Sequence, residues 1–128
     1  MLIALAVFAA VSVLLHVYIW YLESFAWTGR ARAVFGTSAT EAAATRELAY
    51  NQGFYNLFLA IIAGVGIVIA VAGNRGVGTA LILAGTGSML GAAVVLLLSS
   101  PDKRAAAVKQ GTAPLATVVL GVIWALMG

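Results

Sequence analysis

Hydrophobic positions follow one another in four long runs, separated by short polar segments. The runs cover residues 2–22, 54–72, 77–98 and 112–127, and His16 is the only histidine, acidic or basic residue inside them. A helix needs about 20 apolar residues to cross the hydrocarbon of a bilayer. The pattern therefore predicts an all-α integral membrane four-helix bundle, with helices at about 2–25, 39–72, 77–99 and 103–127.

The polar segments carry the chemistry of helix ends and turns. Residues 73–76 (GNRG) predict a tight helix–helix connection, and residues 99–102 (SSPD) predict a helix stop and restart. Ser38 and Glu41 have the spacing of a capping box. The second helix is therefore expected to begin well before the bilayer, and residues 30–35 are expected to form a short amphipathic turn at the interface.

Basic residues predict how the chain is oriented. Three lie between the first and second apolar runs (Arg30, Arg32 and Arg46), and three lie between the third and fourth (Lys103, Arg104 and Lys109). Arg75 alone lies between the second and third runs, on the other side of the membrane. Cytoplasmic loops carry the excess of Lys and Arg. We expect both long loops in the cytoplasm and both termini outside, in a bacterial cytoplasmic (inner) membrane.

Composition agrees with a membrane protein of a single domain spanning residues 1–128. Hydrophobic residues make up 63% of the chain and charged residues 9%, against roughly 25% charged in a soluble domain. The lipid bilayer is thus the expected partner. The net charge of +3 fits loops that face anionic lipid, and no basic–aromatic surface suggests nucleic acid.

Few catalytic or metal-binding chemistries fit this composition. The chain has no cysteine and one histidine, which leaves no metal site with an ordinary set of ligands. No catalytic triad or phosphate-binding loop is recognisable. We assign no catalytic residue and no metal ligand, and the sequence indicates no particular cofactor.

Polar residues of the first helix share one face. His16, Glu23 and Trp27 are spaced i, i+7 and i+11, and this spacing repeats one side of a helix. His16 and Glu23 are about 10 Å apart along the axis. Because an ionisable side chain in a membrane is costly unless it finds a partner, this face is expected to point into the bundle.

A second polar set lies at the same depth. Asn51, Gln52 and Asn56 open the second helix, and Gln110 opens the fourth. We expect these amides to form a cytoplasm-facing polar pocket with the face of the first helix. An alternative stays open, since such amides often only hydrogen-bond helix to helix and tryptophans often anchor at the interface.

The third helix carries a small-residue surface. Gly87 and Gly91 are four residues apart, a spacing that permits close helix packing. We expect packing within the bundle, with an interface between protomers of a homo-oligomer as the alternative. Residues 46–57 also match residues 104–115 weakly, which would fit a tandem repeat of two hairpins.

These residues resemble a known family. The segments HVYIWYLESFAW (16–27), RAVFG (32–36), NQGFYN (51–56) and KQGTAP (109–114) occur in this order. The chain thereby resembles the small bacterial membrane proteins grouped as domain of unknown function 1304. The resemblance implies four transmembrane helices and no established activity, and it marks these positions: His16, Glu23, Trp27, Asn51, Gln52, Asn56, Gln110 and Pro114.

Three functions remain open from the sequence. The favoured one is binding or transport of a small amphipathic or lipophilic molecule, whose head group His16 and Glu23 would recognise and the amides would orient. The second is an enzyme with His16 as acid–base residue acting on a lipophilic substrate. The third is a structural subunit of a membrane complex.

Overall fold

The computed structural model describes residues 1–128 and is helical throughout, without strands. Its elements, in chain order, are α1 (Leu2–Phe25), α2 (Ala31–Phe35), α3 (Ala39–Val71), α4 (Arg75–Ser99), the 3₁₀ turn η1 (Pro101–Lys103) and α5 (Arg104–Leu126). The four long helices are each long and apolar enough to cross a membrane. The protein is an all-α membrane bundle of four helices, as the hydropathy pattern predicts.

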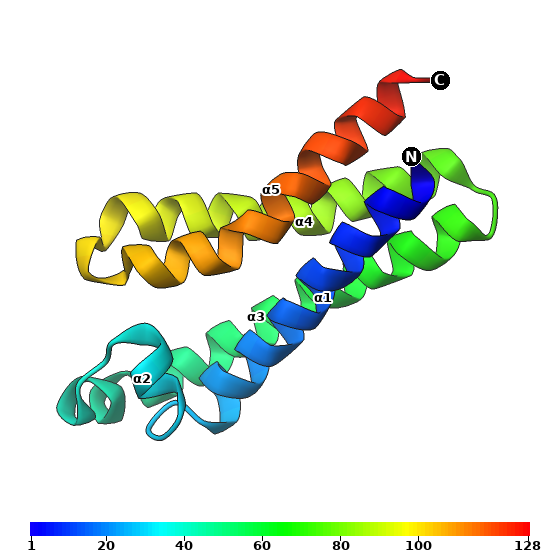
Figure 1. Cartoon of the computed structure of the whole chain (residues 1–128). Coiled ribbons are helices and arrows are strands. Elements are labelled where there is room, and N and C mark those ends of the chain that lie inside the picture. Colours follow the sequence, from blue (N-terminus) through cyan, green and yellow to red (C-terminus); the bar gives the residue numbers. More distant parts are fainter.

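The long helices are arranged as a ring. α1 packs against α3 and α5, and α4 packs against the same two helices, so that α1 and α4 face each other across the bundle. Both termini and the α3–α4 turn lie at one end of the molecule, and α2 and the α4–α5 turn lie at the other (Figure 1). The ends of α3 and α5 that carry the predicted amides are therefore at the same end as the C-terminus of α1.

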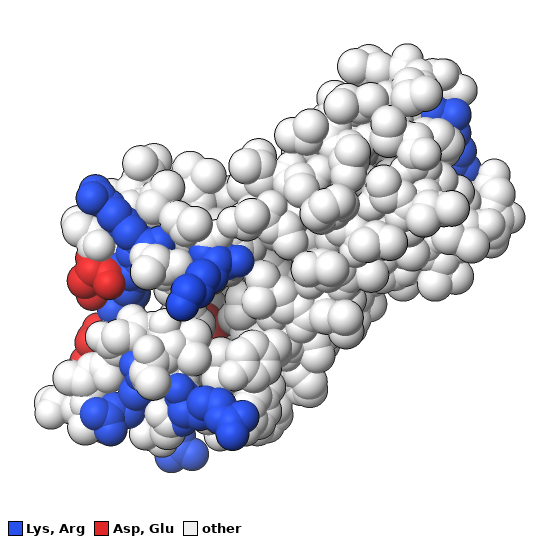
Figure 2. All heavy atoms as spheres, viewed as in Figure 1, with Lys and Arg blue, Asp and Glu red and all other residues white.

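Charge is divided between the two ends in the same way. Most of the basic and acidic side chains gather at the end formed by α2 and the α4–α5 turn, and a lone basic group lies at the far end (Figure 2). Arg75, at the start of α4, has its guanidinium 3.6 Å from the ring centroid of Trp124. It also donates a hydrogen bond to the Trp124 carbonyl.

α3 and α4 approach each other through glycine. A Cβ atom added at Gly66 would lie 2.7 Å from the backbone nitrogen of Ile82, and one added at Gly85 would lie 2.9 Å from the carbonyl oxygen of Leu59. The two backbones are thus almost in contact. Close packing of this kind provides much of the attraction between helices in a membrane, where the hydrophobic effect does not act between them.

Gly87 and Gly91 do not take part in this packing. A Cβ atom at either position would meet no atom within 4 Å, and Gly91 is exposed on the outside of the bundle. The expectation that they pack within the bundle is therefore wrong. Gly85, two residues before Gly87, lies on the face of α4 that meets α3.

The start of α3 forms one of the two hydrogen bonds of the predicted capping box. The Ser38 hydroxyl accepts a hydrogen bond from the Glu41 backbone nitrogen at 3.1 Å. The Glu41 carboxylate does not return to Ser38 and instead lies 3.6 Å from the Lys103 ammonium. With 33 residues, α3 is about 50 Å long, so its first turns extend beyond a hydrocarbon core of about 30 Å.

The predicted amphipathic turn is the short helix α2. Its apolar side is buried rather than lying on lipid, because Ala31 and Phe35 pack with Ile19 and Leu22 of α1. The Arg32 side chain turns back and donates to the Thr37 carbonyl at 3.3 Å. α2 thus covers the end of α1 and contributes to the wall of the cavity described next.

Candidate functional site

A cavity of about 320 Å³ lies inside the charged end of the bundle. The helices form two hairpins, α1 with α3 and α4 with α5 (Figure 1). The surface at this end is hollowed between the two hairpins, with acidic atoms inside the hollow (Figure 2). All five α-helices and η1 contribute to its wall. The lining residues are Glu23, Trp27, Phe35, Glu41, Thr45, Leu48, Ala49, Gln52, Asn56, Ala92, Leu96, Ser100, Lys103 and Gln110.

The contribution of α3 follows the helical period. Its lining residues are Glu41, Thr45, Leu48, Ala49, Gln52 and Asn56. Their spacings of three and four residues repeat one face of a helix over four turns. The sequence signal for the wider cavity was therefore present, although the interpretation of the sequence used only its last turns.

The cavity opens sideways between α3 and α4. Leu48 is 70% exposed, and Gln52 on α3 and Ala92 on α4 are exposed as well while lining the cavity. Leu48 and Gln52 lie within two turns of Phe54, where the apolar run of α3 begins. The mouth is therefore beside the start of the apolar run of α3.

Glu23 is the most buried charged residue of the wall, with 8% of its surface exposed. Its Oε2 atom accepts a hydrogen bond of 2.7 Å from the Asn56 amide, while Oε1 has no hydrogen-bond partner in the protein. Gly53 makes this pairing possible, since a Cβ there would lie 3.1 Å from the Glu23 Cβ and from the Ser24 backbone nitrogen. The missing side chain lets α1 and α3 come close enough for the bond.

Three more of the predicted residues line the cavity. Gln52 and Gln110 line it from α3 and α5, and Trp27 lines it from the end of α1. The Trp27 indole is held in place because its Nε1 atom donates to the Thr45 hydroxyl at 3.0 Å. Glu23, Trp27, Gln52, Asn56 and Gln110 are thus brought together around one space.

Two predicted residues lie elsewhere. The His16 side chain is 1% exposed and does not line the cavity; its Nδ1 atom is 2.9 Å from the Ser12 carbonyl of its own helix. Because a carbonyl only accepts, Nδ1 carries the proton of this bond. Asn51 is exposed and donates to the Glu47 carbonyl one turn earlier at 3.1 Å.

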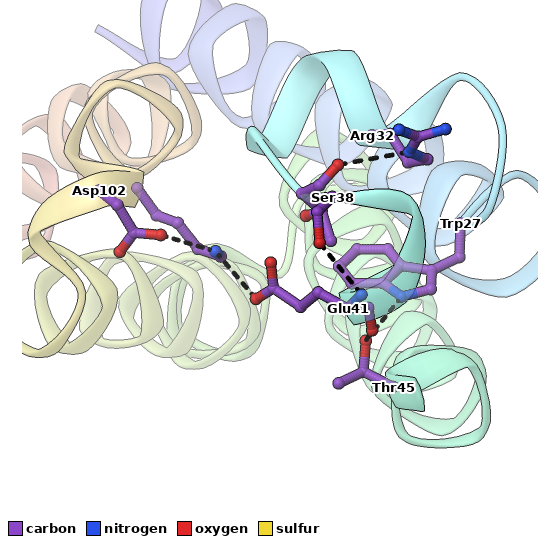
Figure 3. Close-up of polar contacts among 8 residues, drawn as sticks. Trp27, Arg32, Ser38, Glu41, Thr45 and Asp102 are labelled. Atoms are coloured by element: carbon purple, nitrogen blue, oxygen red, sulfur yellow. Dashed lines mark hydrogen bonds and ion pairs between the residues drawn. The ribbon is translucent and has the colours of Figure 1, made fainter. Parts of the chain in front are cut away.

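Lys103 and Glu41 were not among the predicted site residues, and both line the cavity. The sequence marks Lys103 only as a basic residue between two helices, but no more than 18% of its side chain is exposed. Its ammonium is 3.0 Å from Asp102 and 3.6 Å from Glu41. Figure 3 shows Glu41 reaching from the first turn of α3 toward the turn that carries Asp102. The Glu41–Lys103 pair thus joins the two hairpins at the rim.

The charges of the cavity wall do not balance. Glu23 and Glu41 contribute two carboxylates, and Lys103 contributes one ammonium. The ion pairs of the protein are those of Lys103 with Glu41 and with Asp102. Glu23 takes part in neither, so its only polar partner is the neutral amide of Asn56.

Comparison with known proteins gives one match. No curated protein and no solved structure is similar enough to this chain to count as a match. The family described as protein of unknown function (DUF1304) matches residues 10–122, which include α3 and α4, most of α1 and α5, and every cavity-lining residue. The matched segment also holds the four sequence motifs on which the resemblance rests. The chain belongs to this DUF1304 family of proteins of unknown function.

Proposed function

We propose that this protein binds a small amphipathic molecule, with the polar head group of the ligand in the cavity and its apolar part toward the lipid. The observation that carries the proposal is that residues far apart in the sequence, Glu23, Gln52 and Gln110, line one cavity of about 320 Å³. Small-molecule sites in proteins have volumes of about 300–1,000 Å³. The cavity would hold a head group and a short part of a chain.

The position of the mouth supports an amphipathic ligand over a water-soluble one. The cavity opens at the membrane interface between α3 and α4, beside the exposed Leu48. On the aqueous side, the Glu41–Lys103 ion pair crosses its rim. A molecule arriving within the bilayer can insert its head group sideways and leave its tail among the lipids. In a bacterial inner membrane, the charge distribution would put this mouth at the cytoplasmic leaflet.

Binding fits the structure better than transport by a single chain. Deeper in the bundle, the interior is filled by the buried side chains of Met89, Thr86 and Ile82. A ligand in the cavity would therefore need a rearrangement of the helices to reach the other leaflet. The enzyme alternative has less support, because its acid–base residue His16 does not line the cavity.

The proposal is tested by filling the cavity. Ala49 lines it and is 5% exposed, so Ala49→Leu would occupy part of the space. Ala43→Leu is the matched control, because Ala43 is exposed on the same helix. Wild-type protein and both variants are purified in the same detergent, and the small molecules that each retains are identified by native mass spectrometry.

We expect the wild type and Ala43→Leu to retain the same amphiphile, and Ala49→Leu to lose it at least tenfold. A melting curve for each protein checks that Ala49→Leu is folded. Identical retention by all three proteins, or no retained amphiphile in the wild type, would contradict binding in the cavity.

A further inference from the structure

We infer that the head group bound in the cavity is a protonated amine, an inference that rests on the proposed binding function. The observation is a carboxylate, Glu23, that is 8% exposed, lines the cavity and lacks a cationic partner. An ionised group within a membrane bundle is costly unless a counter-charge or several hydrogen bonds compensate for it. The protein supplies one hydrogen bond, from Asn56 to Oε2.

Lys103 does not provide the missing charge. It is the only basic residue that lines the cavity, and its ammonium is already shared between Asp102 at 3.0 Å and Glu41 at 3.6 Å. The wall therefore keeps one negative charge in excess, located at Glu23. A cation is attracted to this space and an anion is repelled from it.

The chemistry of the wall indicates an organic ammonium rather than a metal ion. No group of three or more acidic, histidine or cysteine side chains is placed to hold a metal. The wall instead includes the aromatic rings of Trp27 and Phe35, whose centroids are 5.6 Å apart. Aromatic side chains beside a carboxylate suit an ammonium group, which they attract through their π faces.

The hydrogen-bonding groups favour an amine that carries N–H donors. Glu23 Oε1 has no hydrogen-bond donor within the protein, and Gln52 and Gln110 line the cavity with side-chain amides whose carbonyl oxygens can accept. The three hydrogens of a primary ammonium group match these three acceptors. A quaternary ammonium of the same charge would leave them without donors, and this difference can be measured.

The experiment compares amphiphiles that differ only in the head group. The four probes carry the same ten-carbon chain with a photoreactive diazirine near the head, which is a primary amine, a trimethylammonium, an alcohol or a carboxylate. The full chain is reconstituted in nanodiscs of zwitterionic lipid, because anionic lipid would concentrate cations at the surface without any site. After irradiation, labelled peptides are mapped and quantified by mass spectrometry.

Two matched variants separate the site from its surroundings. Glu23→Gln removes the charge and keeps the shape of the side chain. Glu47→Gln makes the same change on the exposed side of α3, outside the cavity. Melting curves and elution volumes establish that both variants are folded.

We expect the amine to label the cavity peptides at least tenfold more than the alcohol or the carboxylate, and several-fold more than the trimethylammonium probe. Glu23→Gln should reduce amine labelling to the level of the alcohol, while Glu47→Gln should leave it unchanged. Equal cavity labelling by amine and alcohol, unaffected by Glu23→Gln, would overturn the amine and leave the binding function intact. Labelling confined to lipid-facing peptides for all probes would overturn both.

Discussion

Glu23 combines burial with incomplete pairing, and this combination distinguishes it from the other charged residues of the chain. Its hydrogen bond comes from Asn56, 33 positions further along the chain. A hydrogen bond to a charged group contributes about 1.5–3 kcal/mol to stability. The Asn56 amide is thus expected both to stabilise the bundle and to fix the orientation of the carboxylate in the cavity.

This coupling between Glu23 and Asn56 can be measured. Asn56→Leu should lower the free energy of unfolding by about 1–3 kcal/mol, because it leaves the buried carboxylate without a donor. In a Glu23→Gln background, Asn56→Leu should lower the free energy of unfolding by less, because no charged group is left without a hydrogen-bond donor. Reversible unfolding in mixed micelles gives the four free energies of this double-mutant cycle. An equal cost of Asn56→Leu in both backgrounds would contradict the coupling.

At the scale of the helices, the packing of α4 depends on which of its glycines meets α3. A Cβ atom added at Gly85 would lie 2.9 Å from the Ala63 Cβ and 2.9 Å from the Leu59 carbonyl oxygen. A Cβ atom added at Gly91 would meet no atom within 4 Å. Both are small residues on the same helix, six positions apart, so composition does not separate them. Their different surroundings make them a matched pair for mutation.

Gly85→Ala should therefore destabilise the bundle by about 1–3 kcal/mol, as expected when an atom is forced into a well-packed interior. Gly91→Ala should be neutral or stabilising by up to about 1 kcal/mol, because alanine favours the helix more than glycine. Thermal unfolding of both variants in one detergent compares them. Destabilisation by Gly91→Ala, together with a change of elution volume, would instead indicate that Gly91 packs between protomers.

At the scale of the whole molecule, the cavity owes its existence to the way the two hairpins meet. They are in close contact along α3 and α4 through glycine, and they are joined again at the rim by Glu41 and Lys103. Between these two contacts lies the cavity. The six basic residues that predict the cytoplasmic side are on the elements that surround it, and Arg75 begins α4 at the opposite end of the molecule (Figure 1).

The orientation that this distribution predicts can be tested directly. The chain has no cysteine, so single cysteines introduced at exposed positions report their side of the membrane cleanly. In intact cells a membrane-impermeant maleimide should label Gly128→Cys and should not label Asp102→Cys until the cells are lysed. The opposite labelling pattern would reverse the orientation and put the mouth of the cavity in the outer leaflet.

The sequence by itself determined the number and extent of the spanning helices. A segment that crosses a bilayer must be apolar over about 20 residues, and this can be judged for each segment separately. It also placed Glu23 on the face of α1 that His16 shares, since the helical period is a local property, whereas Trp27 lies in the turn after α1. The pairing of distant surfaces required the tertiary structure. Gly53 beside Ser24 aligns Asn56 with Glu23, and the return of the chain after α4 brings Lys103 to Glu41.

The same distinction explains why His16, Gly87 and Gly91 lie elsewhere than expected. His16 shares a face of α1 with Glu23, but it lies deeper in the bundle than the cavity. There its side chain is buried and bonds to the Ser12 carbonyl of its own helix. Gly87 and Gly91 have the spacing of a packing motif, yet α4 turns Gly85 toward α3. Periodicity fixes which residues of one helix share a face, and only the contact with another helix decides which face is inside.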